Sequence, residues 1–73
     1  MKLWELWDVI GKRDTVEIWL YSVDGNTQYS CAYYYPDTDK WLYHGEDFHN
    51  FTEWNVVSVT AVYHNSYSVR IEK

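Results

Sequence analysis

Apolar side chains recur at a helical spacing in the first part of the chain. Over residues 2–11 they stand at i, i+3, i+4 and i+7, namely at Leu3, Leu6, Trp7 and Ile10. This spacing predicts a short helix with one apolar stripe, with Trp4 beside the stripe. Gly11 is placed to end the helix in a left-handed conformation, and Lys12 and Arg13 follow where positive charge favours a helix end.

From Thr15 to Val23 the pattern changes to the alternation of a half-buried strand. Asp24-Gly25 then predicts a two-residue type I′ turn, because glycine accepts a positive φ. Such a turn places one set of six side chains on the face that the helix covers, paired as Leu20–Tyr29, Ile18–Cys31 and Val16–Tyr33. The opposite face then carries Glu17, Trp19 and Tyr21 against Ala32, Ser30 and Gln28.

Three further strands are expected beyond the turn at Pro36-Asp37-Thr38-Asp39. Lys40–His44 forms the third, and Phe48 and Phe51 after it allow either one helical turn or an ordered loop. Val56–Tyr63 is apolar on both faces, which is typical of a central strand or of one covered by a second subunit. Tyr67–Ile71 alternates, with Tyr67, Val69 and Ile71 inward.

Together these patterns predict a single α+β domain over residues 1–73. A short N-terminal helix packs on an antiparallel sheet of about five strands, arranged as a hairpin, a third strand and a C-terminal hairpin.

Aromatic content changes this picture more than any motif. Five Trp, eight Tyr and two Phe are too many for the core of a 73-residue chain, so several must lie on the surface. Exposed Trp and Tyr are typical of binding surfaces and of subunit interfaces. We therefore expect a binding protein that forms a homo-oligomer. The net charge of −5 opposes direct binding to duplex DNA.

The sequence contains no signal peptide and no apolar run long enough to cross a bilayer, so we expect a cytoplasmic protein that binds no membrane. Cys31 is the only cysteine, which excludes a disulfide within the chain. Its apolar surroundings in a strand predict a buried, neutral thiol and not a nucleophile.

No residue pattern indicates catalysis, and we expect neither an enzyme nor a cofactor. His44, Glu46, Asp47 and His49 have the side chains of zinc ligands, but their spacing matches no established zinc motif. A polar loop without metal is the preferred interpretation. The carboxylate pairs stand in turns, and the three glycines form no phosphate-binding loop.

Two surfaces are candidate binding sites. The first is acidic and aromatic and would contact a protein partner through Asp37, Asp39, Trp41, Tyr43, Glu46 and Asp47. The second is the outward sheet face, where aromatic rings would stack on a nucleotide base while cations hold its phosphates, through Arg13, Trp19, Tyr21 and Arg70.

The first 35 residues resemble the start of small proteins encoded by phages of Gram-positive bacteria. The resemblance is carried by the helical segment Leu3-Trp4-Glu5-Leu6-Trp7-Asp8-Val9-Ile10 and by Lys12-Arg13-Asp14-Thr15-Val16 leading into a hairpin. Some anti-CRISPR proteins of this group are acidic α+β domains with a similar opening. The resemblance implies phage origin and counter-defence, either by blocking a nuclease that binds nucleic acid or by sequestering a nucleotide signal. We expect first an inhibitor that blocks a host defence protein. The alternatives are an oligomeric protein that sequesters a nucleotide signal, or a viral structural or assembly protein.

Overall fold

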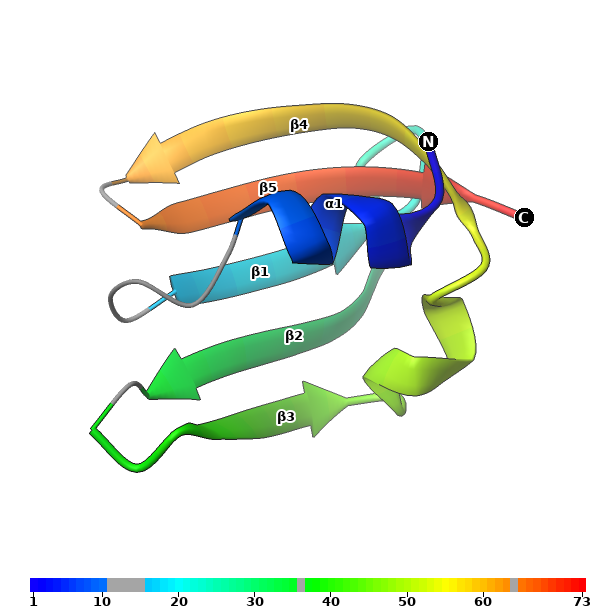
Figure 1. Ribbon diagram of the computed structural model, residues 1–73. Coiled ribbons are helices and arrows are strands. Elements are labelled where there is room, and N and C mark those ends of the chain that lie inside the picture. The colour runs from blue at the N-terminus through cyan, green and yellow to red at the C-terminus, as the bar shows by residue number, and fades with distance from the viewer. Residues whose placement is uncertain (11–15, 36, 64) are drawn as a thin grey trace.

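A computed structural model describes residues 1–10, 16–35, 37–63 and 65–73 of the protein (Figure 1). It confirms the α+β class: one helix precedes a five-stranded sheet. The elements are α1 (Leu3–Ile10), β1 (Val16–Tyr21), β2 (Gln28–Tyr35), β3 (Lys40–Gly45), the 3₁₀ turn η1 (Phe48–Phe51), β4 (Asn55–Tyr63) and β5 (Ser66–Glu72). Gly11, Lys12, Arg13 and Pro36, which the sequence assigned to a helix end or a turn, lie outside the described residues.

The strand order across the sheet is β3-β2-β1-β5-β4. Three of the four pairings are antiparallel, and the central pairing of β1 with β5 is parallel, so the sheet is mixed. Strand direction explains the parallel pair. The chain alternates direction along β1, β2 and β3, and then crosses through η1 to β4 at the opposite edge of the sheet. It returns in β5, which runs in the same direction as β1 (Figure 1).

β4 is an edge strand, so the prediction of a central strand is wrong. The alternation of β4 is blurred because the register against β5 shifts twice, between Val56 and Ser58 and between Ala61 and Tyr63. Each shift changes which face the next side chains occupy. The apolar residues on both faces of β4 reflect these irregularities and not burial between two strands, since Val57, Val59 and Val62 are exposed.

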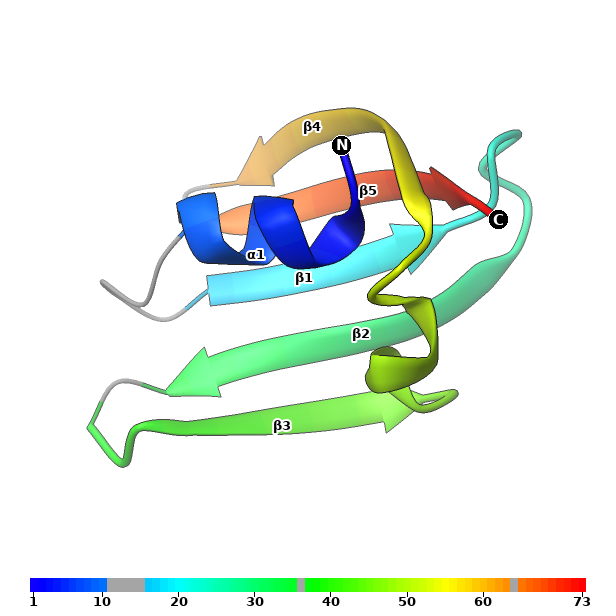
Figure 2. The ribbon, with the colours of Figure 1, turned by 45° about the vertical axis from the view of Figure 1, so that its right-hand side comes forward.

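α1 and η1 lie on the same side of the sheet, which we call the helix-covered face; the other side is the open face (Figures 1 and 2). Backbone hydrogen bonds fix the start of α1 to the segment before β4, from Leu3 N–H to the Trp54 carbonyl (2.9 Å) and from Trp4 N–H to the Thr52 carbonyl (3.1 Å). Leu3 and Leu6 are buried as the apolar stripe predicts, and Trp7 packs against the core.

The core fills the space between the sheet, α1 and η1. Its fully or nearly fully buried members come from both halves of the chain: Leu3, Val16, Ile18, Leu20, Phe48, Phe51, Val69 and Ile71. The predicted alternation of β1 and of β5 is therefore confirmed. Phe48 and Phe51 confirm the helical turn, since η1 places both rings in the core. None of the described helices is long and apolar enough to cross a membrane.

The hairpin loop between β1 and β2 is wider than the predicted two-residue turn. Gly25 has the expected positive φ (+79°), but four residues separate Ser22 from Thr27, whose carbonyl accepts from Ser22 N–H at 2.8 Å. The Asp24 carboxylate organises this loop by accepting from the Ser22 hydroxyl (2.5 Å) and from Asn26 N–H (2.9 Å). The Ser22 hydrogen bond is also the main cause that lowers the pKa of Asp24.

Beyond the loop, β2 holds one extra residue at Tyr29. Tyr21 pairs with Gln28 as predicted, but the next pair is Leu20 with Ser30. Each later pair is shifted in the same way, as Trp19–Cys31, Ile18–Ala32, Glu17–Tyr33 and Val16–Tyr34. The predicted pairs of Leu20 with Tyr29, Ile18 with Cys31 and Val16 with Tyr33 are therefore wrong. Ser30, Ala32 and Tyr34 share the helix-covered face, whereas Cys31 and Tyr33 lie on the open face.

The bulge at Tyr29 has a packing cause. The Tyr29 ring stacks on Phe51 with centroids 5.2 Å apart and meets the edge of Trp54 at 5.5 Å. The next residue, Ser30, is also buried, and its hydroxyl donates to the carbonyls of Glu46 (2.6 Å) and His44 (3.2 Å). Two successive side chains can face the core only where the regular alternation of a strand is broken.

Candidate functional site

The acidic and aromatic residues predicted as a protein-binding surface follow β3, the other edge strand. We call this surface the β3 strip: Asp37, Asp39, Trp41, Tyr43, Glu46 and Asp47. Asp37 and Asp39 precede β3, and Glu46 and Asp47 follow it, so the two carboxylate pairs lie at opposite ends of the strand. Trp41 and Tyr43 lie between them with nearly parallel rings, 6.4 Å apart at 16°. The residues form an extended strip and not a single cluster.

Trp41 and Tyr43 are also part of the helix-side packing. Trp7 meets Trp41 edge-on at 4.6 Å and Phe48 at 4.5 Å, and Tyr43 lies 5.8 Å from Phe48. Trp41 is half-buried, whereas Tyr43 remains 37% exposed. Burial, and then the charge of Asp47, raise the pKa of Tyr43. A partner would therefore contact the outer parts of two rings that the core already holds in place.

Two of the four carboxylates have partners within the chain. Asp39, in a left-handed conformation with φ 50°, accepts from the Tyr34 hydroxyl at 2.6 Å, and this hydrogen bond raises the pKa of Tyr34. Asp47 caps η1 by accepting from His49 N–H at 3.0 Å, the main cause that lowers the Asp47 pKa, and its Oδ1 lies 3.1 Å from His49 Nδ1. Asp37 and Glu46 are exposed.

The possible zinc ligands are only partly brought together. Asp47 and His49 are in contact, but His44 lies on the open face of β3, where its ring meets Tyr33 at 5.4 Å. In the described parts of the chain, no three His, Cys, Asp or Glu side chains are placed to hold a metal ion.

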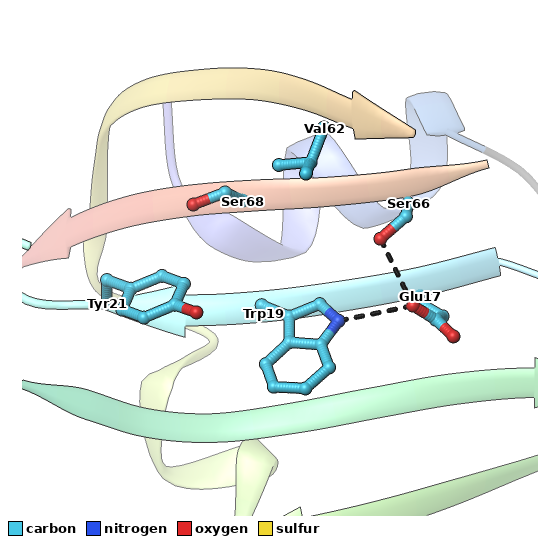
Figure 3. A pocket seen from close by; sticks show the side chains of 6 residues that line it. All are labelled: Glu17, Trp19, Tyr21, Val62, Ser66 and Ser68. Carbon is cyan, nitrogen blue, oxygen red and sulfur yellow. Dashed lines mark hydrogen bonds between the residues drawn. The ribbon is translucent and has the colours of Figure 1, made fainter. Parts of the chain in front are cut away.

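The open face carries a cavity of about 270 Å³ over β1, β5 and the end of β4 (Figure 3). It is lined by Glu17, Trp19, Tyr21, Val62, Ser66 and Ser68. Trp19 and Tyr21 were predicted for a ligand site on this face, and the structure places both in the cavity wall. The sequence did not identify Glu17, Val62 or the two serines as site residues. Glu17 alternates with the buried residues of the strand just as Trp19 and Tyr21 do. That alternation alone could have assigned it to the same face.

Glu17 holds the side chains around it in place. Its Oε2 accepts from the Trp19 indole N–H (3.3 Å) and from the Ser66 hydroxyl (3.1 Å), as the dashed lines in Figure 3 show. The second hydrogen bond joins β1 to β5 across 49 residues of sequence. The indole orientation is therefore set by a carboxylate that itself lines the cavity.

Of the cations predicted for a nucleotide site, Arg70 is not among the described residues that line this cavity. Arg13 lies outside the described residues. Arg70 pairs with Tyr21, but its guanidinium reaches over the hairpin loop and donates to the Val23 carbonyl at 3.2 Å. Its Nη2 would lie 2.8 Å from a Cβ placed on Gly25, so the loop and the guanidinium are in close contact. Among the described residues, Glu17 and not a cation supplies the charge next to Trp19.

Cys31 is buried as predicted, at 1% exposure, but on the open face and not on the helix-covered one. Burial raises the pKa of its thiol, and the hydrogen bond with the Tyr33 hydroxyl lowers that pKa in part. The same hydrogen bond is the main cause that raises the pKa of Tyr33 to about 12. Both groups are therefore protonated at neutral pH, which disfavours a nucleophilic role for Cys31.

Comparison of the chain with protein-family models, with curated proteins and with solved structures found no match.

Proposed function

We propose that the protein is a non-enzymatic inhibitor that binds a basic surface of another protein through the β3 strip. The observation that supports this proposal most directly is the position of exposed carboxylates at both ends of an edge strand, with two stacked and partly exposed aromatic rings between them. Rigid aromatic rings flanked by acidic groups are suited to a groove that otherwise receives bases and phosphates.

A counter-defence role in the host cytoplasm is the form of this function that the sequence resemblance implies. The partner would then be a defence protein whose basic groove binds nucleic acid. The negative charge of the chain supports the same class of partner, because it favours encounter with a positively charged protein.

The test separates the β3 strip from charge in general. One variant combines Asp37→Asn, Asp39→Asn and Glu46→Gln, and leaves Asp47 in place because it caps η1. A control variant removes three exposed carboxylates elsewhere, through Asp8→Asn, Glu53→Gln and Glu72→Gln. Both variants change the net charge equally. Each is expressed in bacteria that carry a nuclease-based defence, and phage plaques are counted.

The wild type and the control variant are expected to restore plaque formation, and the β3 variant is expected to lose this effect. Binding to the captured defence protein should fall by about tenfold or more in the β3 variant and should weaken with salt. Equal activity of the two variants, or no effect of the wild type on any such defence, would contradict the proposal.

We also propose that β4 pairs with β4 of a second copy. After its first residues, where Val56 N–H donates to the Met1 carbonyl (2.8 Å), the outer edge of β4 pairs with no other described strand. Residues 57–63 carry no charged side chain, so two copies of an acidic protein can meet here without placing like charges opposite each other.

Light scattering tests this self-association. Val57→Lys is expected to give a monomer, because an exposed charge on an edge strand opposes pairing with a second strand. Val23→Lys is the matched control, since Val23 has a similar exposure in the hairpin loop (44% against 46%). A monomeric wild type would refute the proposed β4 pairing.

A further inference from the structure

The open-face cavity lies apart from the β3 strip and needs its own explanation. Its wall combines two aromatic rings, the methyl groups of Val62, two serine hydroxyls and one carboxylate, Glu17 (Figure 3). No lysine or arginine is among these lining residues. Through its described lining residues, the cavity therefore offers apolar surface and a single negative charge to whatever enters it.

Trp19 is held firmly enough to act as a binding platform. Its indole N–H donates to Glu17, and its ring meets the edge of Tyr33 at 6.2 Å and 79°. Figure 3 shows the indole projecting from β1 between Tyr21 and Glu17, with its ring face toward the viewer. An exposed indole face attracts cations through the ring quadrupole, and tryptophan is the best of the aromatic side chains for this contact.

The carboxylate adds to the same preference. One oxygen of Glu17, Oε2, accepts both hydrogen bonds, and within the described residues Oε1 accepts none. A fixed carboxylate beside an indole face repels phosphate and favours positive charge. One carboxylate and the three hydroxyls of Tyr21, Ser66 and Ser68 provide too few charged oxygens for a calcium or magnesium ion, which prefers a fuller set of oxygen ligands.

We propose that this cavity binds an organic cation, namely an ammonium group with carbon substituents. Its methyl or methylene groups would contact Trp19, Tyr21 and Val62 while its charge faces Glu17. The cavity volume of about 270 Å³ suits a small headgroup or the end of a side chain and not a whole nucleotide. This proposed site is independent of the β3 strip and is an alternative to the nucleotide interpretation of Trp19 and Tyr21.

The experiment uses the full chain labelled with ¹⁵N and follows its indole N–H signals during titration with choline. The chain has five tryptophans, so four indole signals serve as internal controls for the signal of Trp19. The neutral compound 3,3-dimethyl-1-butanol has the same shape as choline without its charge. Nα-acetyl-lysine amide, which keeps a charged side-chain ammonium group, is titrated separately and represents a lysine side chain of a partner protein.

Choline is expected to shift the Trp19 signal in a saturable way, with a Kd on the order of millimolar, and to leave the other four signals nearly unchanged. The neutral compound is expected to bind about tenfold more weakly. Tighter binding of the lysine derivative than of choline would identify a protein side chain as the source of the cation, and the reverse order would identify a free amine.

Glu17→Gln should weaken choline binding by about tenfold, and Glu53→Gln, which removes the same charge at an exposed site, should not. Equal binding of choline and its neutral analogue by the wild type would overturn the proposal without any variant. No saturable shift with either cation, or unchanged choline affinity in a folded Glu17→Gln protein, would also overturn it.

Discussion

On the helix-covered face of β1, Val16, Ile18 and Leu20 are at most 3% exposed, whereas Glu17, Trp19 and Tyr21 on the open face are all partly exposed. The two sets alternate along the same six residues. The first set meets α1, η1 and β5 in a closed apolar core, and the second surrounds a cavity. One strand thus supplies stability on one face and binding chemistry on the other. Substitutions on the helix-covered face should mainly change stability, and those on the open face should mainly change binding.

The largest expected effect is on the helix-covered face. Phe48→Ala removes a fully buried ring that contacts Trp7 and Tyr43, and it should lower the free energy of unfolding by about 3–5 kcal/mol. Trp19→Ala, on the open face, removes a larger but partly exposed ring and should cost less, about 2 kcal/mol. Urea unfolding of both variants measures the difference. Equal losses would show that the open face is as much a core as the covered one.

Ser30 tests whether the covered face depends only on apolar contacts. Its buried hydroxyl donates to the carbonyls of His44, within β3, and of Glu46, just after it, and Ser30→Ala leaves those acceptors without it. We expect a loss of about 1–3 kcal/mol in the free energy of unfolding. Ser68→Ala on the open face is the matched control and should change that value by no more than about 0.5 kcal/mol. A neutral Ser30→Ala would show that water replaces the hydroxyl.

The open face should make stability sensitive to alkaline pH. The pKa values of Cys31 and Tyr33 are both raised in the folded chain, above usual values of 9.0 and 10.0. Both groups are neutral when protonated, so their contribution to stability is complete below pH 9 and is lost as the pH rises toward 12. Thermal melts of the wild type and of Tyr33→Phe between pH 8 and pH 11 measure this loss. The melting temperature of the variant should decrease less over this pH range. Identical curves would show that Tyr33 does not cause the loss.

The smallest effect is expected at low pH from η1. Hydrogen bonds from His49 lower the pKa of Asp47 below 3.8, so the charged carboxylate stabilises the folded chain above that value and this contribution is lost as the pH falls. Asp47→Asn should remove part of the acid sensitivity and leave stability near pH 7 only slightly reduced. Melting curves between pH 2 and pH 7 test this, and an unchanged acid transition would exclude Asp47 as a contributor.

Local patterns predicted most of the elements because their causes are local. The stripe of Leu3 and Leu6 and the alternation of β5 follow from one face of each element meeting the core. The pairing of Tyr21 with Gln28 also followed from the hairpin. The register beyond it did not, because the Tyr29 bulge depends on Phe51 and Trp54, more than 20 residues further along the chain.

The candidate sites likewise combine features that local patterns predict with features that depend on distant parts of the chain. Trp19 and Tyr21 were assigned to one face by alternation alone, and the structure places them together. Alternation could not predict that β5 and the end of β4 would complete the cavity, because strand order depends on how the chain crosses the sheet. Trp41 and Tyr43 were interpreted as surface residues, but Trp7 packs against them from a helix more than 30 residues earlier.

The parallel pairing of β1 with β5 determines when the open-face cavity forms during folding. β1, β2 and β3 can assemble as soon as they are synthesised, but the pair of Glu17 with Ser66 closes a loop of 49 residues and must wait for β5. The open-face cavity straddles this pair of strands. A nascent or partly folded chain therefore has no such cavity, and a ligand for it would recognise only molecules that have completed their folding.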